Sequence, residues 1–216
     1  MSSDDYFLKL KRNQVLMIRD RGYDISDEEW ILDVKGLTGK KFKKKLLKKY
    51  EKDYDYPLRK LMFSEYHHPH KDKPLFIYYV CIDQGKQIKV ETVKPFIHKM
   101  TEENKDGLLV IDSPLSPTAA ECFSIITEHH YQIFKEEDLL FNVISHIQCD
   151  VHVLCTEAEV STLKKKGVSG KGLLWLLHTD PIAQYYGFPI GSYVKIIVYI
   201  DVPMMNQQRC HYRVVV

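Results

Sequence analysis

Long apolar stretches are missing from this sequence, and so are the patterns of several common protein classes. No run of about eighteen or more apolar residues is available to cross a membrane. The opening residues, MSSDDYFLKLKRNQ, contain no apolar segment followed by a small-residue cleavage site. The five cysteines are scattered and form no CxxC pair, which argues against both a disulfide framework and a zinc ribbon. We therefore expect an intracellular protein with buried, reduced thiols.

The charge of the chain is distributed unevenly. Of its 216 residues, 44% are hydrophobic, which is enough to bury the core of one large or two small domains. The net charge is only +2, yet residues 1–60 hold 16 Lys and Arg against 11 Asp and Glu. This balance favours neither a strongly basic nor a strongly acidic protein as a whole. Most of the excess positive charge of residues 1–60 lies in one basic segment.

The basic segment is KKFKKKLLKKYEK, residues 40–52. Its apolar residues Phe42, Leu46, Leu47 and Tyr50 recur at helical spacing, so the predicted helix turns its lysines to solvent. Such a face could lie against phosphates, and the alternative is a solvated basic face with no partner. The candidate phosphate-facing residues are Lys40, Lys41, Lys43, Lys44, Lys45, Lys48 and Lys49.

Residues 1 to about 140 alternate between helical and strand patterns. An opening helix is expected to end at Gly22, and Ser26 with Glu29 has the pattern of a capping box that begins a second helix. The following elements are predicted in order: a buried strand at 73–82, its partner at 86–93, a helix from Val93 to Glu103, a strand at 107–112, and a helix that Ser116 caps and Pro117 begins. This alternation favours an α/β layer with the sheet between helices.

The pattern changes after KEEDLLFNVISHI, and a second domain is expected from residue 145. The predicted domains are therefore 1–144 and 145–216. Thr156 and Glu159 form a capping box at the start of a short helix in the second domain. The glycine-rich segment 164–172 that follows lacks the spacing of a phosphate-binding loop.

The stretch TDPIAQYYGFPIGSYVKI specifies its backbone closely. Asp180 suits a helix N-cap, Pro181 suits the first helical position, and Gly187 can end the helix after barely two turns. Gly191 then makes a turn into strand 192–200, with which 209–216 can pair as a hairpin. A terminal hairpin offers an exposed edge where another chain can dock.

These C-terminal residues resemble a known family. The segments DPIA (180–183), YYG (185–187), Gly191 and VKI (194–196) are similar to the signature of the fifth subunit of eukaryotic nuclear RNA polymerases. That subunit is shared by polymerases I, II and III, and its C-terminal domain corresponds to a small subunit of the archaeal RNA polymerase. The similarity continues through EEDLLFNVISH, LSPTAAECF, HKMTEEN and RDRGYDISDEE, and so covers nearly the whole chain.

The resemblance implies an α+β protein of two domains and a non-catalytic subunit of a DNA-directed RNA polymerase. The N-terminal domain would be an endonuclease-like α/β jaw without an active site that supports downstream DNA. The C-terminal domain would be a small α/β assembly domain with a β-hairpin that packs on the largest subunit. No cofactor, metal, membrane or small-molecule substrate is implied. The location would be the nucleus, or a viral factory or virion for a viral protein. The candidate assembly residues are Asp180, Pro181, Tyr185, Tyr186, Gly187, Gly191 and Lys195.

The sequence departs from the family pattern at several basic positions. The family usually has Arg before Tyr-Tyr-Gly, a basic pair before the next glycine, Arg-Pro-Ser-Glu after the strand, and Pro-Arg before Asp-Pro. His152, in the strand before the assembly residues, keeps the place of a family histidine. At the family's four basic positions this chain has, in the same order, Gln184, Pro189-Ile190, Val198-Tyr199-Ile200-Asp201 and Leu177-His178. Cationic groups that could bind a partner are therefore missing here.

Enzymatic interpretations find little support in the residues. A metal-dependent nuclease of this fold needs an Asp followed by Asp/Glu-x-Lys on a strand. The strand at 73–82 offers only Asp83, which Gln84 and a glycine follow, and Asp33 to Lys35 lies away from any predicted strand. The HHPH segment, residues 67–70, has a proline that breaks ligand spacing. His152 and Cys155 lack a third, orienting group. The main alternative is a free-standing basic nucleic-acid-binding protein that uses the Lys40–Lys52 helix.

Overall fold

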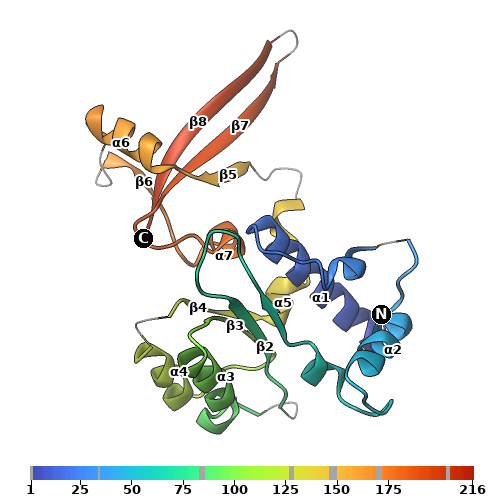
Figure 1. The fold of residues 1–216 in the computed structure, drawn as a ribbon. Coiled ribbons are helices and arrows are strands. Elements are labelled where there is room, and N and C mark those ends of the chain that lie inside the picture. The colour runs from blue at the N-terminus through green and yellow to red at the C-terminus, as the bar shows by residue number, and fades with distance from the viewer. Residues whose placement is uncertain are drawn as a thin grey trace. The chain divides into compact units, whose positions relative to one another are not determined.

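The computed structural model of the chain describes residues 2–33, 35–82, 86–126, 129–145, 150–168, 172–202 and 205–216 (Figure 1). They form two compact units, Met1–Phe141 and Asn142–Val216, which we call the N-terminal unit and the C-terminal unit. Each unit combines helices with one four-stranded sheet, so the mixed α+β class expected from the sequence is confirmed. Among the described residues, no helix has the length and apolar character needed to cross a bilayer.

The N-terminal unit is a sheet with helices around it. Its sheet has the strand order β1-β2-β3-β4, in which β1 is antiparallel to β2 and the other strands are parallel. The elements are α1 (Ser3–Asp20), η1 (Glu29–Leu32), α2 (Gly39–Lys49), η2 (Leu58–Leu61), β1 (Ser64–Tyr66), β2 (Leu75–Tyr79), α3 (Val90–Glu102), β3 (Asp106–Ile111), α4 (Pro117–Ser124), β4 (Tyr131–Lys135) and α5 (Glu136–Leu139).

Alternate residues along β2 serve the two faces of this sheet. Phe76 and Val80 belong to the apolar core that α3 and α4 cover. Ile77 and Tyr79 are also buried, and the Tyr79 hydroxyl donates a hydrogen bond to Gln14 of α1 at 3.4 Å. Figure 1 shows α3 and α4 on one side of the sheet and α1 on the other. The predicted layer with the sheet between helices is therefore confirmed.

Several local predictions for this unit are also confirmed. Gly22 follows α1 with φ +85°, in the left-handed region that favours glycine after a helix. The Ser116 hydroxyl accepts a hydrogen bond from Ala119 N–H at 3.3 Å and caps α4. The basic segment forms α2, which buries Phe42, Leu46 and Leu47 as its periodicity predicts.

The predicted pairing of residues 86–93 with the strand at 73–82 is wrong. Ile88 makes one isolated bridge with Leu115, and α3 begins at Val90. The apolar side chains of α3 have helical spacing and bury on the sheet, which outweighs the β-branched composition at the start of this helix. The partners of β2 are instead β1 and the parallel strand β3, which lies beyond the crossover helix. Strand β4 was not predicted.

The capping box predicted at Ser26 and Glu29 is also wrong. The helical turn η1 begins after Glu28 and has no side-chain cap, while Ser26 N–H donates to the Asp24 carboxylate at 2.9 Å. Glu28 points inward and makes an ion pair with Lys11 of α1 at 3.1 Å. This long-range pairing fixes the segment in a conformation that the local sequence does not indicate.

Lys11 and Glu28 are the centre of a buried polar network. The Glu28 carboxylate accepts hydrogen bonds from the hydroxyls of Ser64 and Tyr66, and Gln14 donates to the Tyr66 hydroxyl at 2.9 Å. Burial by itself raises the pKa of Glu28, but Lys11 and the two hydroxyls outweigh it, so the net pKa lies below its ordinary value. Burial lowers the pKa of Lys11 against the opposing effect of Glu28. The network ties α1 to β1 and to the chain before η1.

The C-terminal unit is a second sheet with short helices beside it. The strand order is β5-β7-β8-β6, with β7 and β8 forming the predicted antiparallel hairpin and β6 parallel to β8. The predicted capping box of Thr156 and Glu159 is present at the start of α6. The elements are η3 (Val143–Ser145), β5 (Val151–Leu154), α6 (Glu157–Lys165), β6 (Leu174–Leu176), α7 (Pro181–Tyr186), β7 (Tyr193–Val202) and β8 (Met205–Val215).

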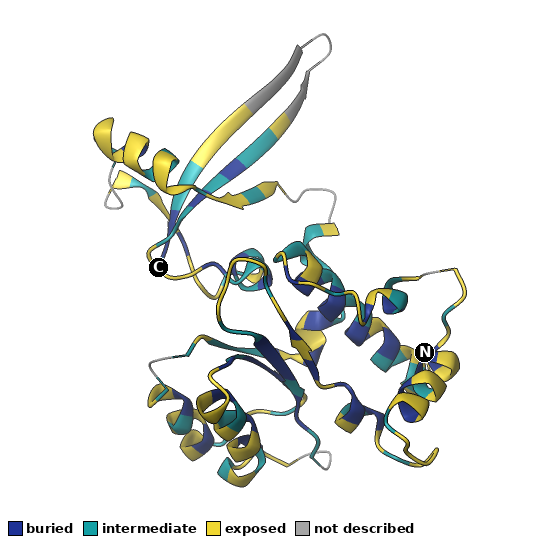
Figure 2. Ribbon diagram, viewed as in Figure 1, coloured by how far each residue is buried: buried dark blue, intermediate teal, exposed yellow. Residues whose placement is uncertain are grey.

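The two units differ in how much of their apolar surface is buried. Figure 2 shows the central strands β2 and β3 of the N-terminal sheet buried, whereas much of the C-terminal unit is half-buried or exposed. Among the described residues of the C-terminal unit, the apolar core contains a small cluster made of Leu176, Ala183, Phe188, Val194, Ile196 and Val215. A thin core leaves many of this unit's apolar side chains at the surface.

We expect Glu28→Gln to destabilise the N-terminal unit by roughly 3–5 kcal/mol at pH 7, because Lys11 would keep a buried charge without its partner. Urea unfolding followed by circular dichroism measures this free energy. The matched control is Glu102→Gln, since the pair of Glu102 with His98 is well exposed.

The ion pair of Lys11 and Glu28 should also make the stability of the N-terminal unit depend on pH. Because the pKa of Glu28 is lowered on folding, its stabilisation is present above the unfolded pKa of about 4.3 and is lost as the pH falls through the folded value. The stability of Glu28→Gln should therefore fall less between pH 7 and pH 3 than that of the unsubstituted chain. Equal pH dependence of the two proteins would contradict this role for Glu28.

Candidate partner-binding surface

The short helix α7 has the start and the end that its sequence specifies. Asp180 is the N-cap, and its Oδ1 accepts a hydrogen bond from Ile182 N–H at 2.8 Å. Pro181 occupies the first turn, where the missing N–H costs nothing. Gly187 ends the helix with φ +65°, in the left-handed region. Asp180, Pro181 and Gly187 therefore determine where α7 begins and ends.

The turn after α7 is tied to the end of the chain. Gly191, with φ +86°, donates its N–H to Val215 O at 2.8 Å, and Val215 N–H donates to Ser192 O at 2.9 Å. His178 N–H donates to Val216 O at 2.8 Å, and Val216 N–H returns a bond to Leu176 O at 3.0 Å. The segments before and after α7 are therefore fixed to Val216 and Val215, respectively.

The two tyrosines of α7 have different surroundings. Tyr185 is buried, with 7% of its surface exposed, whereas Tyr186 is half-buried. The two rings meet edge to face with centroids 5.2 Å apart, and Tyr186 stacks on Phe188 at the same distance. Within the folded chain, Tyr186 offers more contact area than Tyr185.

Lys195 of β7 is held by α6 within the C-terminal unit. Its ammonium lies 2.5 Å from the Glu159 carboxylate, the same residue that completes the capping box of α6. The hydrogen bond from Lys195 lowers the pKa of Glu159, and the reciprocal hydrogen bond raises the pKa of Lys195. The ion pair fixes α6 against this part of the sheet.

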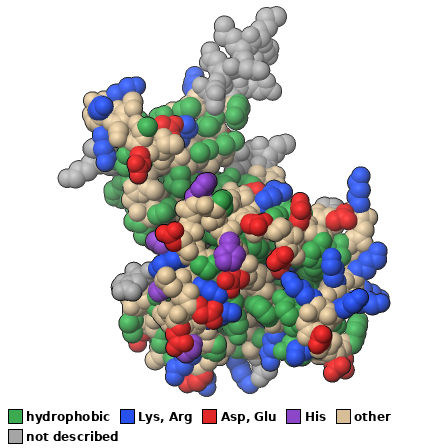
Figure 3. Space-filling model, viewed as in Figure 1, with side chains coloured by type: hydrophobic (Ala, Val, Ile, Leu, Met, Phe, Trp, Pro, Cys, Tyr) green, Lys and Arg blue, Asp and Glu red, His purple; other side chains and the backbone are tan. Residues whose placement is uncertain are grey.

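Sequence reasoning missed a set of exposed apolar side chains around the edge strand β6. We call them the β6-edge surface: Leu174, Trp175, Leu177 and Ile190, with 57–70% of each residue exposed. Leu177 and Ile190 flank residues that bond to the end of β8, so all four lie at one end of the sheet. Figure 3 shows hydrophobic side chains over much of the visible face of this unit. The segment GLLWLL could have indicated this exposure. Successive side chains of a strand point to opposite faces of a sheet, so one buried face cannot hold all of these large apolar residues.

The lysines of α2 divide into two groups. Lys45 lies 3.7 Å from the ring centroid of Trp30, Lys43 lies 4.1 Å from that of Tyr54, and Lys49 lies near Tyr50. Lys41 donates to Gly36 O at 2.9 Å. The remaining three, Lys40, Lys44 and Lys48, are exposed and follow one another at four-residue spacing. They form a stripe along one face of the helix, and Figure 3 shows Lys and Arg side chains gathered over the α2 part of the N-terminal unit.

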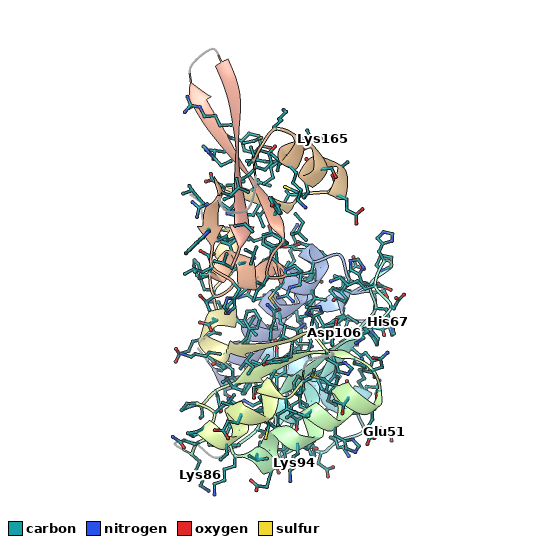
Figure 4. The ribbon with its side chains drawn as sticks, turned by 90° about the vertical axis from the view of Figure 1, so that its left-hand side faces the viewer. Glu51, His67, Lys86, Lys94, Asp106 and Lys165 are labelled. Carbon is teal, nitrogen blue, oxygen red and sulfur yellow. The ribbon has the colours of Figure 1, made fainter. Side chains whose placement is uncertain are left out.

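The histidines and acidic residues considered for metal binding do not converge. No group of three His, Cys, Asp or Glu side chains suited to a metal occurs in the described parts of the chain. His67, labelled in Figure 4, is largely exposed, while His68 Nδ1 accepts a hydrogen bond from His70 N–H at 3.0 Å. Asp33 follows η1 in a non-strand segment, and Asp83 lies outside the described residues. The described residues therefore place no carboxylate cluster on a strand.

Comparison with known proteins defines the class of the C-terminal unit. Residues 141–215 match the family described as RNA polymerase Rpb5, C-terminal domain, and this match is nearly coextensive with the C-terminal unit. That unit belongs to the Rpb5 C-terminal domain family.

The chain as a whole is similar in sequence to proteins named as the fifth subunit of DNA-directed RNA polymerases, in agreement with its sequence motifs. It is 28% identical over 193 residues to "DNA-directed RNA polymerases IV and V subunit 5B" of Arabidopsis thaliana, covering 88% of this chain and 82% of the relative. It is 26% identical over 131 residues to "DNA-directed RNA polymerases I, II, and III subunit RPABC1" of Caenorhabditis elegans, covering 59% and 62%. The first match spans both units.

Gly191→Ala tests how firmly the turn after α7 is specified. A Cβ at this position meets no atom within 4 Å, so the cost arises from the left-handed backbone alone and should be about 1–2 kcal/mol of unfolding free energy. Gly172→Ala is the control, because it also meets open space and its φ lies outside the left-handed region. Chemical denaturation of both variants measures the difference. Equal stability of the two would show that the turn is not constrained as the structure indicates.

Proposed function

We propose that this chain is a non-catalytic subunit of a multisubunit DNA-directed RNA polymerase, and that its C-terminal unit packs on the largest subunit. The observation that carries the proposal is the β6-edge surface, because a unit with so small a core leaves large apolar side chains exposed. Large apolar side chains exposed at one edge of a sheet favour a protein interface there. The membership of this unit in the Rpb5 C-terminal domain family supports a polymerase subunit as the partner.

The candidate assembly residues have two kinds of role in this proposal. Asp180, Pro181, Gly187 and Gly191 shape the backbone around α7, so they act on the interface through the fold. Lys195 acts in the same way, since Glu159 holds it. The contact area comes from Tyr186 and the β6-edge surface, where stiff aromatic and branched side chains lose little conformational freedom on binding. Tyr185 supports the helix from a buried position.

The N-terminal unit acts as the jaw in this proposal and supports downstream DNA. The exposed stripe of Lys40, Lys44 and Lys48 supports this role, since successive lysines lie about 6 Å apart along the helix axis and could follow a phosphate backbone. Lysine contacts of this kind carry no base-reading information, which suits a surface that meets every transcribed sequence. The metal ions and the catalytic residues would belong to the large subunits, in the nucleus or in a viral factory or virion.

Replacing Leu174 and Trp175 together by serine should reduce recovery of the largest polymerase subunit roughly tenfold when the tagged chain is purified from its native source. The melting temperature of the isolated chain should change little, because both side chains are already exposed. Ile125→Ser is the matched control, as Ile125 is an exposed apolar residue of the N-terminal unit. Unchanged recovery of the double variant, or an equal loss in the control, would contradict the proposed interface.

The lysine stripe makes a separate prediction for DNA. Replacing Lys40, Lys44 and Lys48 by glutamine should remove up to three phosphate contacts. The negative slope of log affinity against log salt should then become less steep by roughly 2–3. Fluorescence anisotropy with a labelled duplex, between low and physiological salt, measures this slope for the polymerase purified with the tagged chain. The isolated chain should bind the duplex poorly, since salt-sensitive binding by the chain alone would favour a free-standing nucleic-acid-binding protein.

The control for the stripe keeps the same change in net charge. Lys41, Lys43 and Lys45 are each engaged by a carbonyl or an aromatic ring, so their replacement by glutamine should change the slope much less. Equal effects of the two triple variants would show that the DNA responds to net charge and not to this stripe.

A further inference from the structure

The strand β5 forms one edge of the C-terminal sheet in the part of the chain that the structure describes. The strand order ends at β5, and no described residue pairs with its outer edge. Cys155 N–H donates to Tyr193 O at 2.9 Å, which identifies residues 155 and 193 as a hydrogen-bonded pair of the β5–β7 ladder. Because such pairs alternate in an antiparallel ladder, the backbone N–H and C=O groups of His152 and Leu154 point away from β7.

The side chains of β5 do not protect this edge. Natural edge strands are guarded by charged residues, proline or bulges, and the sequence VHVL of β5 contains no proline and no lysine, arginine or carboxylate. Val151 and Val153 lie on one face of the sheet and Leu154 on the other, and 42% of each is exposed. The edge therefore presents unpaired backbone groups between apolar side chains on both faces.

We propose that the outer edge of β5 is a strand-addition site, where an extended segment of another polymerase subunit pairs with His152 and Leu154. A partner helix could not satisfy these groups, because a helix uses its own backbone hydrogen bonds internally. Nucleic acid is disfavoured because β5 offers no lysine or arginine side chain. An extended segment with alternating apolar residues fits both the backbone groups and the exposed side chains.

This site is distinct from the β6-edge surface, which lies at the opposite edge of the same sheet. It rests on the proposed function for the identity of its occupant. The two edges together would hold the C-terminal unit at both sides of its sheet. The β5 edge would contribute mainly backbone hydrogen bonds, and the β6 edge mainly apolar contact area.

Hydrogen exchange tests the proposal on the unsubstituted protein. The amides of His152 and Leu154 should exchange roughly tenfold or more slowly in the polymerase purified with the tagged chain than in the isolated chain. The amide of Val153, which faces β7, should be protected in both states and serves as the internal reference. Equal exchange of His152 and Leu154 in the two states would overturn the proposal.

A pair of variants separates the backbone group from the side chain. Leu154→Pro removes the outward N–H without removing a β5–β7 hydrogen bond, whereas Leu154→Ala removes the side chain and keeps the N–H. Recovery of the largest subunit should fall roughly tenfold for Leu154→Pro relative to Leu154→Ala. Equal recovery would overturn the strand-addition site and leave the proposed function standing. Failure of the unsubstituted chain to recover any polymerase subunit would overturn both.

Discussion

The end of the chain holds the C-terminal unit together. Through their backbone groups, Val215 and Val216 bind the turn at Gly191 and the segment around His178, on either side of α7. Val215 also contributes its side chain to the small apolar core. Because α7 has barely two turns, its placement depends on these bonds and on its caps more than on its own helical stability. These bonds therefore hold α7 in place although the C-terminal unit buries few residues.

Because backbone bonds hold the C-terminal unit together, it can leave apolar side chains at its surface. Trp175 and Leu174 stand at the β6 edge, and Val151, Val153 and Leu154 stand at the β5 edge, while the interior remains thin. The N-terminal unit differs, because both faces of its sheet are covered by helices and its polar network around Lys11 is buried. This contrast supports the proposal that the C-terminal unit contributes the binding surfaces for other subunits.

Much of the local structure could be predicted from the sequence, since residues with few conformational options specify it. Asp180, Gly187, Gly191 and the capping box at Thr156 were identified in this way. Pairing between distant segments could not be predicted: β2 pairs with β3 beyond a crossover helix, and the pairing of Lys11 with Glu28 overrides the local pattern at Ser26. The β6-edge surface was missed because the run GLLWLL indicates only that some of its apolar side chains are exposed. Which of them are exposed depends on the strands that lie beside Leu174 and Trp175.

The most direct test of this account is affinity purification of the tagged chain from its native source in about 0.5 M salt, where weak surface contacts are screened. Quantitative mass spectrometry then gives the amount of each protein that remains bound. The account predicts the two largest polymerase subunits at equal stoichiometry with the chain. A chain that elutes alone, or with nucleic acid only, would contradict it and favour a free-standing basic nucleic-acid-binding protein.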